Sequence, residues 1–353
     1  MAARLLIWRV VRTALAVLVL ASGLFLLSRA DTDTALRLAL PNAPDYGGRA
    51  SASLAQEAAA QTALRQRLGL HLPLFYIGRG VGPASHAVRW QWHGTANQYH
   101  LWAGRLLHGD LGTSFRTGAA VAPRLRAALA ITLPLTGTAA VLAVVLAFAL
   151  AQRLAARPRW HAAVRAALAA VQAMPLFMVS LLLLLVFANP EVLAWFPAYG
   201  LAQLTATGAA AVGQYLARLV LPIAALTLTA LPELTLQLEA ALARELRTDY
   251  ATTARAKGLA ESAIIRHHAL RNALLPTLTQ LVELLPALVA GAVVVEVVFA
   301  LPGTGRLLAE ASAARDYPVL LGGVLLVGAV RSFALLLADL LYFWADPRIR
   351  WQP

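Results

Sequence analysis

ITLPLTGTAAVLAVVLAFAL, residues 131–150, is a continuous stretch without a charged side chain. A helix of this length extends about 30 Å at about 1.5 Å per residue, which matches the hydrocarbon core of a bilayer. The stretch therefore predicts a transmembrane helix. Working outward from it, comparable apolar runs occur at Val10–Leu27, Val164–Phe187, Gln214–Leu236, Leu278–Phe299 and Val319–Trp344. We expect an all-α fold, a polytopic transmembrane helix bundle of about six spans.

The overall composition is that of a membrane protein. Hydrophobic residues make up 59% of the 353 residues and charged residues 13%, whereas soluble domains carry about 25% charged residues. The excess of 30 Lys and Arg over 17 Asp and Glu would favour nucleic-acid binding in a soluble chain, but arginines beside membrane spans mark cytoplasmic loops. We therefore expect no nucleic-acid partner. The absence of cysteine excludes disulfides, thiolate metal sites and cysteine nucleophiles.

The arginines that flank the apolar runs predict the orientation. They crowd the connections between the second and third runs and between the fourth and fifth, whereas residues 189–215 contain neither Lys nor Arg. By the positive-inside rule, both termini should be cytoplasmic. The chain then divides into an N-terminal transmembrane helix (1–30), an external segment (31–128) and a five-helix core (129–350).

The first apolar run has one further interpretation. Ser28-Arg29-Ala30 resembles the small-residue site at which a signal peptide is cleaved. Arg29 fits poorly just before such a cut, and the later spans make a separate export signal unnecessary. We expect the first helix to remain uncleaved.

The connection between the fourth and fifth spans, residues 238–276, is the most informative segment. Residues 246–276 read LRTDYATTARAKGLAESAIIRHHALRNALLP, with apolar side chains at helical spacing among basic ones. Gly258 is placed to end one helix so that a second can begin near Glu261. Such a helix–turn–helix suits two roles: docking into a groove of a partner through Tyr250 and Ala254, or resting on anionic lipid headgroups.

These residues also carry a resemblance to a known family. Asp249-Tyr250, the stretch from Ala254 to Leu259 and the stretch from His268 to Pro276 resemble the cytoplasmic coupling loop of the dipeptide and oligopeptide permeases, a branch of the binding-protein-dependent ABC importers that also contains nickel importers. Similar elements are found at residues 109–114, 291–296, 302–306, 315–318 and 346–350. The resemblance is dense from residue 109 to residue 350 and thin before it, where residues 78–99 look like additional sequence.

The resemblance implies the fold of a type I ABC importer permease, with residues 129–350 as the permease core. Such a permease moves peptides or similar small solutes through the lipid bilayer of the bacterial cytoplasmic (inner) membrane, which would make the external segment 31–128 periplasmic. The residues it assigns to ATPase coupling are Asp249, Tyr250, Ala254, Arg255, Ala256, Lys257, Gly258 and Leu259. It implies a homologous second permease chain, two ABC ATPase subunits and an external solute-binding protein as partners. The chain has one lysine and no G-x-x-x-x-G-K-[ST] phosphate cradle. ATP and Mg would therefore be bound by the ATPase subunits, leaving this chain without a cofactor or a catalytic reaction.

Three ionisable residues in the last two expected spans are candidates for the pathway or gate, because a charge inside a membrane costs several kcal/mol unless it is paired or hydrated. Glu296 matches a glutamate of the family and either lines the pathway or holds neighbouring helices together. Arg331 and Asp339 share a helix but point about 80° apart around it, so they cannot pair with each other.

Two further glutamates lie within expected spans. Glu283 is close to the cytoplasmic end of its span, where we expect it to reach the interface or to meet Arg271. Glu233 lies near two prolines and is expected to serve in helix packing.

Histidines recur in the external segment at positions 71, 86, 93, 100 and 108. Helical neighbours seven residues apart are separated by about 10 Å, which is too far for one metal ion with bonds near 2 Å. We therefore expect no metal site. The interleaved Trp90, Trp92, Tyr99 and Trp102 favour packing at the external interface of the membrane, where aromatic side chains concentrate.

The motifs leave two alternatives open. Importers of nickel chelates, glutathione or opines share this fold, so the solute is not fixed. A stand-alone channel or a membrane enzyme is the more remote alternative. A channel needs no docking loop, and the sequence contains neither H-E-x-x-H nor a paired nucleophile and base.

Overall fold

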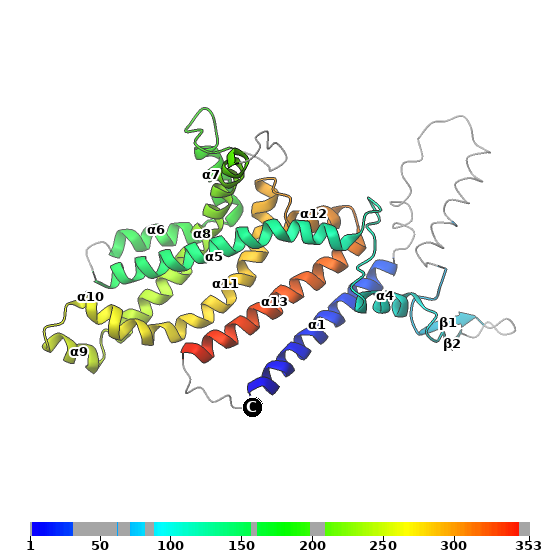
Figure 1. Ribbon diagram of the computed structural model, residues 1–353, viewed down its shortest axis with the longest axis horizontal. Helices are drawn as coiled ribbons and strands as arrows, with labels where there is room; N and C mark the ends of the chain where they lie inside the picture. Colours follow the sequence, from blue (N-terminus) through cyan, green and yellow to red (C-terminus); the bar gives the residue numbers. More distant parts are fainter. Residues whose placement is uncertain are drawn as a thin grey trace. The chain divides into compact units, whose positions relative to one another are not determined.

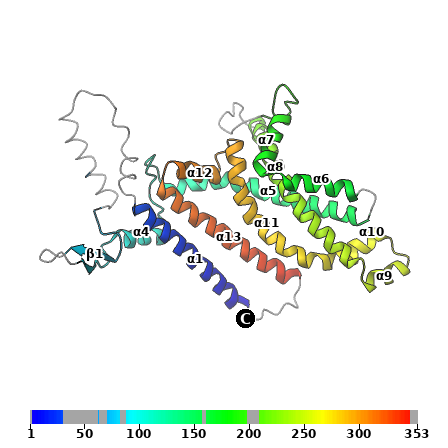
Figure 2. The ribbon, with the colours of Figure 1, turned by 180° about the vertical axis from the view of Figure 1, so that it is seen from behind.

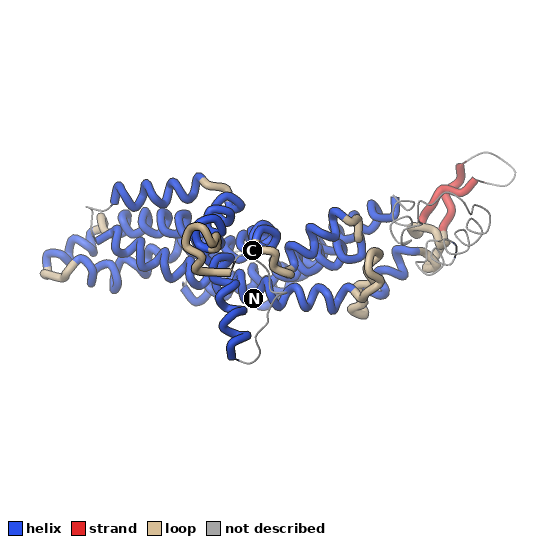
Figure 3. Tube along the Cα trace, turned by 90° about the horizontal axis from the view of Figure 1, so that it is seen from above, coloured by secondary structure: helices blue, strands red, loops and turns tan. Residues whose placement is uncertain are grey.

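The computed structural model describes residues 2–30, 62, 71–81, 88–156, 161–197 and 209–345. Helices dominate these residues, and the strands among them form one hairpin (Figure 3). The chain divides into two compact units. The bundle unit comprises residues 1–13, 127–307 and 329–353, and the hairpin unit comprises residues 14–126 and 308–328.

The elements follow the order predicted from the apolar runs, with additional short helices between them (Figure 1). The helices are α1 (Ala2–Ala30), α4 (Gln98–Leu107), α5 (Val121–Ala156), α6 (His161–Ala173), α7 (Leu176–Phe187), α8 (Ala209–Glu245), α9 (Asp249–Ala256), α10 (Glu261–Ile264), α11 (Leu270–Val298), α12 (Thr304–Ala313) and α13 (Tyr317–Ala345). A π-helical turn covers Ile265–Ala269, and the strands are β1 (Ile77–Val81) and β2 (Val88–Trp92).

Five of the described helices are long and apolar enough to cross a membrane. Their candidate spans are Val11–Arg29, Val121–Ala156, Ala210–Glu245, Pro276–Val298 and Tyr317–Leu337. A sixth span arises if α6 and α7 are taken together as one broken crossing. The predicted all-α, polytopic fold is thus confirmed.

The third expected span, Val164–Phe187, is not one straight helix. The chain bends by 106° between α6 and α7. Pro175, which precedes α7, has a φ of −58° and a ψ of 143° and therefore leaves the helical region. Proline supplies no N–H for the helical ladder, and its ring also disfavours helical geometry in the residue before it. Alone, α7 extends only about 18 Å at about 1.5 Å per residue.

The bundle unit is built around α8 and α11, which pack along each other, with α6 and α7 against α8 (Figure 2). Ala139 and Ala143 of α5 and Ala225 of α8 are fully buried in its largest apolar cluster. Small side chains such as these let membrane helices approach closely, so that van der Waals contacts stabilise the bundle. Leu226 and Val295 fill the space between the backbones.

The hairpin unit holds the described part of the external segment. β1 pairs antiparallel with β2, which places Ile77 opposite Trp92. Asn97 caps α4 by accepting a hydrogen bond from the His100 N–H at 2.8 Å. The α4 rings pack on Phe25 of α1, with the Trp102 ring stacked at 4.8 Å between centroids. The predicted aromatic packing of this segment therefore involves the end of the first span.

Candidate functional site

The predicted helix–turn–helix is present as α9 and α10, which reach beyond the C-terminal end of α5 (Figure 1). Gly258 follows α9 with a left-handed φ of +81°. Its N–H donates to the Arg255 carbonyl at 2.9 Å, and the Leu259 N–H donates to the Ala254 carbonyl at 3.2 Å. This pair of bonds is the Schellman arrangement, which satisfies carbonyls at a helix end and strongly favours glycine. The predicted helix-ending role of Gly258 is confirmed.

The inner face of α9 packs on its own bundle. Ala251 and Ala254 are buried in a cluster with Leu242, Ile264 and Ile265. Ala254 is only 7% exposed, so it points inward and not toward a partner, contrary to the docking contact expected from the sequence. The apolar face of α9 is covered by apolar residues of the π-helical turn at Ile265–Ala269. This face is therefore not available to a partner.

The outer side of the segment is a continuous exposed edge, residues 255–260, which we call the coupling edge. Its apolar member is Leu259, which is 43% exposed. Arg255 closes the turn with a bidentate pair to Glu261, in which Nη2 lies 2.7 Å from Oε1 and Nε lies 3.0 Å from Oε2. These hydrogen bonds hold the pKa of the Glu261 carboxyl below its ordinary value.

Tyr250 connects three helices. Its hydroxyl donates to Glu245 Oε2 at 2.6 Å, and the same oxygen accepts from Asn272 Nδ2 at 3.3 Å. Burial, followed by the hydrogen bond to Glu245, raises the pKa of the Tyr250 hydroxyl. The residue therefore fastens the start of α9 to the end of α8 and the beginning of α11.

An ion pair between the half-exposed Arg165 and the buried Glu239 joins α6 to α8. Arg165 Nη2 lies 2.6 Å from Glu239 Oε2 and 2.8 Å from Oε1, and His161 Nε2 lies 3.5 Å from Oε1. The Glu239 residue is 1% exposed. Arg165 belongs to the arginines between the second and third apolar runs that predict the orientation, and no sequence pattern pointed to Glu239. The one available signal was the presence of both charges near the ends of apolar runs.

Glu296 is fully buried at the end of α11. Thr132 Oγ1 of α5 donates to Glu296 Oε1 at 2.6 Å, and the Arg306 N–H donates to Oε2 at 3.0 Å. Thr304 donates to Thr132 through both its N–H and its hydroxyl, each at 2.9 Å. Gly303 lies so close to the carboxylate that a Cβ there would overlap it. Of the two roles expected for Glu296, this geometry favours holding neighbouring elements together.

A cavity of about 400 Å³ lies between α7, α8 and α11. The exposed Glu233 and Glu283 both line it, and the half-buried Thr229 and Gln280 line it as well. Within the described residues, Glu283 makes no ion pair with Arg271, which was one of the two positions expected for it. Glu233 lines the cavity, whereas a helix-packing role was expected. The sequence could not reveal that these two carboxylates share one space, because they belong to different helices.

The other two pathway candidates are less defined. Arg331 is exposed on α13 of the bundle unit. Asp339 belongs to the same helix, but its side chain lies outside the part of the chain that the structure describes.

Two of the motif stretches meet in the hairpin unit. Asp316 is buried, and its Oδ1 accepts a hydrogen bond from the Phe115 N–H at 2.9 Å. Ser114 Oγ donates to the other oxygen of the same carboxylate. The loop that ends the external segment is thereby fastened to the start of α13.

The histidines of the external segment make local contacts where they are described. His100 Nδ1 lies 3.0 Å from the Tyr76 hydroxyl, and His108 Nδ1 lies 2.8 Å from the Gly104 carbonyl. No group of three His, Cys, Asp or Glu side chains comes together among the residues that the structure places. His86 lies outside those residues.

The described helices define a multi-span membrane protein with a helix–turn–helix between two of its spans. Residues 125–351 match the family described as binding-protein-dependent transport system inner membrane component. The chain therefore belongs to this family, which is the permease component of ABC importers, and it is a multi-pass protein of the inner membrane with a type I permease fold.

Curated relatives agree with this assignment. The chain is 32% identical over 259 residues to the oligopeptide transport system permease protein AppB of Bacillus subtilis, covering 72% of this chain and 80% of that protein. It is 33% identical over 272 residues to the dipeptide transport system permease protein DppB of Alkalihalophilus pseudofirmus, with coverage of 72% and 81%. It is 34% identical over 275 residues to the di/tripeptide transport system permease protein DppB of Pseudomonas aeruginosa, with the same coverage.

Proposed function

We propose that this chain forms part of the pathway through which an ABC importer moves peptides across the inner membrane. It works with a second permease chain, two ABC ATPase subunits and an external solute-binding protein. ATP and Mg are bound by the ATPase subunits, and this chain itself catalyses no reaction. The observation that carries the proposal is the exposed coupling edge on a permease fold, because a channel that opens without ATP has no use for a docking segment.

The coupling edge meets the ATPase subunit. Residues 255–260 are exposed, whereas Ala251 and Ala254 behind them are packed on Ile264 and Ile265 of their own chain. Movement of the coupling edge is therefore transmitted to the apolar cluster behind it. Leu238 and Leu242 of α8 belong to this cluster, so the movement reaches α8. Leu259 is the apolar anchor, and Asp249, Arg255, Ala256, Lys257 and Gly258 surround it in the contact.

The cavity between α8 and α11 contributes to the pathway. Carboxylates within apolar helices are costly unless they are paired or face water, and Glu233 and Glu283 face this cavity. A free peptide carries an α-amino group with a pKa of about 7.7–8.0, which is mostly protonated at neutral pH. The two carboxylates attract such an ammonium group into a cavity whose other walls are largely apolar. This is the feature that supports peptides over uncharged solutes.

The coupling edge lies on the cytoplasmic side, and both termini are cytoplasmic. A second cavity is lined by Arg153 at the end of α5 and by Arg266 beyond α10, so these arginines belong to the same face of the bundle unit. Arginines gather on the cytoplasmic side of membrane proteins.

The test is copurification of the tagged chain with its candidate ATPase subunits. The Gly258→Asp variant places a carboxylate and a side chain at the left-handed position of the coupling edge and should abolish capture of the ATPase. Thr95→Asp, an exposed position in the turn after β2, is the matched control for added charge and should leave capture unchanged. If the wild-type chain captures no ATPase, the proposal fails, and a stand-alone channel becomes the better interpretation.

A further inference from the structure

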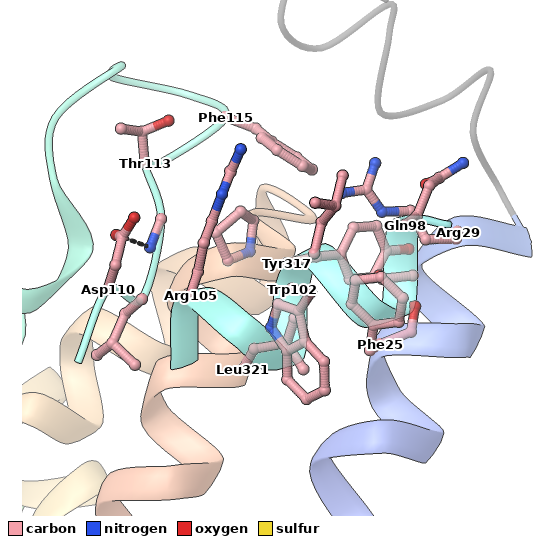
Figure 4. Close-up of a pocket in the computed structure, with 15 residues that line it drawn as sticks. Phe25, Arg29, Gln98, Trp102, Arg105, Asp110, Thr113, Phe115, Tyr317 and Leu321 are labelled. Atoms are coloured by element: carbon pink, nitrogen blue, oxygen red, sulfur yellow. Dashed lines mark hydrogen bonds between the residues drawn. The ribbon is translucent and has the colours of Figure 1, made fainter. Parts of the chain in front are cut away.

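A cavity of about 210 Å³ lies within the hairpin unit, between the end of α1, α4 and the beginning of α13 (Figure 4). Arg29 on its wall is the last residue of one candidate span, and Tyr317 is the first residue of another. The cavity therefore lies where the chain leaves the hydrocarbon core. Its volume far exceeds the roughly 10–15 Å³ that one water needs, so a polyatomic group fits inside.

One side of this interfacial cavity is apolar. Phe25 and Trp102 are stacked on it, and Leu101 and Leu321 extend the apolar wall. Leu101 is an exposed residue of α4. Aromatic rings and leucines at the membrane interface suit the upper part of an acyl chain more than they suit a fully hydrated solute.

The polar side has an excess of positive charge. Arg29 and Arg105 extend from α1 and α4 toward the same part of the cavity, above the aromatic wall (Figure 4). Asp110 is the one carboxylate among the lining residues, and its Oδ1 already accepts a hydrogen bond from the Gly112 N–H at 2.8 Å. Arg29 additionally lies over the Phe25 ring, with Cζ 5.4 Å from the centroid. Guanidinium groups match phosphate oxygens in geometry and charge.

Gln98 supplies an independent sign of a ligand. Its Nε2 donates to the Leu72 carbonyl at 2.7 Å, which fixes the orientation of the amide. Its Oε1 is buried and has no hydrogen-bond partner among the described residues. A buried acceptor normally has a donor, and a hydroxyl carried by a ligand in the cavity would provide one.

We propose that this cavity binds the headgroup of an anionic phospholipid, with the phosphodiester between Arg29 and Arg105 and a headgroup hydroxyl donating to Gln98 Oε1. Phosphatidylglycerol carries both groups. The lipid fastens the end of α1 to α4 and to the start of α13. The site is independent of the transported solute and of the ATPase contact.

The proposal is tested by native mass spectrometry of the full chain, purified with the subunits that accompany it. Three lipids are compared: phosphatidylglycerol, phosphatidylmethanol, which keeps the charge but lacks the hydroxyls, and phosphatidylcholine, which is neutral overall. Phosphatidylglycerol should be retained most strongly and phosphatidylcholine least. Equal retention of the three lipids overturns the proposal.

Arg105→Gln should weaken retention of both anionic lipids about tenfold, because it removes a charge-assisted contact to the phosphodiester. Arg105→Lys, which keeps the charge without the planar fork, should fall between this variant and the wild type. Arg116→Gln removes an exposed arginine of the same unit that does not line the cavity, and it should have no effect. An equal loss in Arg116→Gln would show that the lipid is held by unspecific attraction to positive charge. Displacement of the lipid by millimolar inorganic phosphate would show a site for free anions, and either result overturns the proposal.

Discussion

Each of the two central helices of the bundle unit carries glutamates of two kinds. On α8, Glu239 is buried and paired with Arg165, whereas Glu233 is exposed to the cavity between α8 and α11. On α11, Glu296 is buried and bonded to Thr132 and the Arg306 N–H, whereas Glu283 faces the same cavity as Glu233. The fastened carboxylates have their oxygens occupied by donors of the chain, and the cavity carboxylates keep theirs available.

This difference predicts that the fastened glutamates stabilise the fold, whereas the cavity glutamates act in the proposed pathway. Removing a fastened carboxylate, or its partner, leaves buried polar groups without hydrogen bonds, which lowers the free energy of unfolding. Replacing a cavity carboxylate by its amide changes the charge of the cavity and should leave the free energy of unfolding almost unchanged. Two glutamates of the same helix are therefore expected to give different phenotypes when replaced, loss of stability for the fastened one and loss of uptake for the one in the cavity.

The largest effect is expected for Glu296→Ala. The change removes the acceptor of the Thr132 hydroxyl, which keeps only a longer contact to the Ala128 carbonyl at 3.3 Å, and the Glu296 acceptor of the half-buried Arg306 N–H. Each lost hydrogen bond of this kind costs about 1–3 kcal/mol. Glu296→Gln keeps an acceptor and should cost less. The measurement is the unfolding transition of the purified chain in detergent. Wild-type stability of Glu296→Ala together with a complete loss of transport would instead identify Glu296 as part of the gate.

Arg165→Ala should lower the free energy of unfolding by about 3 kcal/mol, at the low end for breaking a buried pair because Arg165 is half exposed. The loss arises because Glu239 then keeps only His161, at 3.5 Å, beside its buried carboxylate among the described side chains. The double variant Arg165→Ala/Glu239→Leu removes that carboxylate and should recover a large part of the stability. A double variant less stable than the single one would contradict this explanation.

Glu233→Gln and Glu283→Gln should leave the free energy of unfolding within about 0.5 kcal/mol of the wild type. Uptake of a dipeptide with a free amino group should fall about tenfold, which corresponds to about 1.4 kcal/mol of lost attraction for the ammonium. Uptake assays with the N-acetylated dipeptide provide the control, since it lacks that charge. Equal losses for both substrates would argue against ammonium recognition.

The smallest effect is expected for the exposed Arg255–Glu261 pair. Its glutamate is neither buried and fastened nor part of the cavity. Glu261→Gln should cost less than about 1 kcal/mol at neutral pH. The pKa of Glu261 is lowered from 4.5 in the folded chain, so its contribution is present above that pH and is lost as the pH falls through the lowered pKa. The melting temperatures of the wild type and Glu261→Gln should therefore converge in acid. A difference that persists after the carboxyl is protonated would need another cause.

Local sequence signals predicted most spans and the helix–turn–helix, but not the β1–β2 hairpin, α4 or α12. Apolar length predicted the spans, and the spacing around Gly258 predicted α9, the turn and α10, because helices and their ends are set by residues within four positions of one another. The expected span Val164–Phe187 contains Pro175, and the structure has a 106° bend between α6 and α7 there. A proline can bend a helix or be accommodated in it, and neighbouring elements decide which occurs.

The sequence by itself determined that this chain spans a membrane, where most of its spans lie and where a helix–turn–helix connects two of them, since these follow from hydrophobicity and helical period. Only the tertiary structure decided which glutamates are fastened and which face a cavity, and that Ala254 turns inward while Leu259 stays exposed. Thr132 and Glu296 are 164 positions apart, and Arg165 and Glu239 are 74 apart. The environment of a side chain is set by such distant neighbours, and no short-range pattern records them.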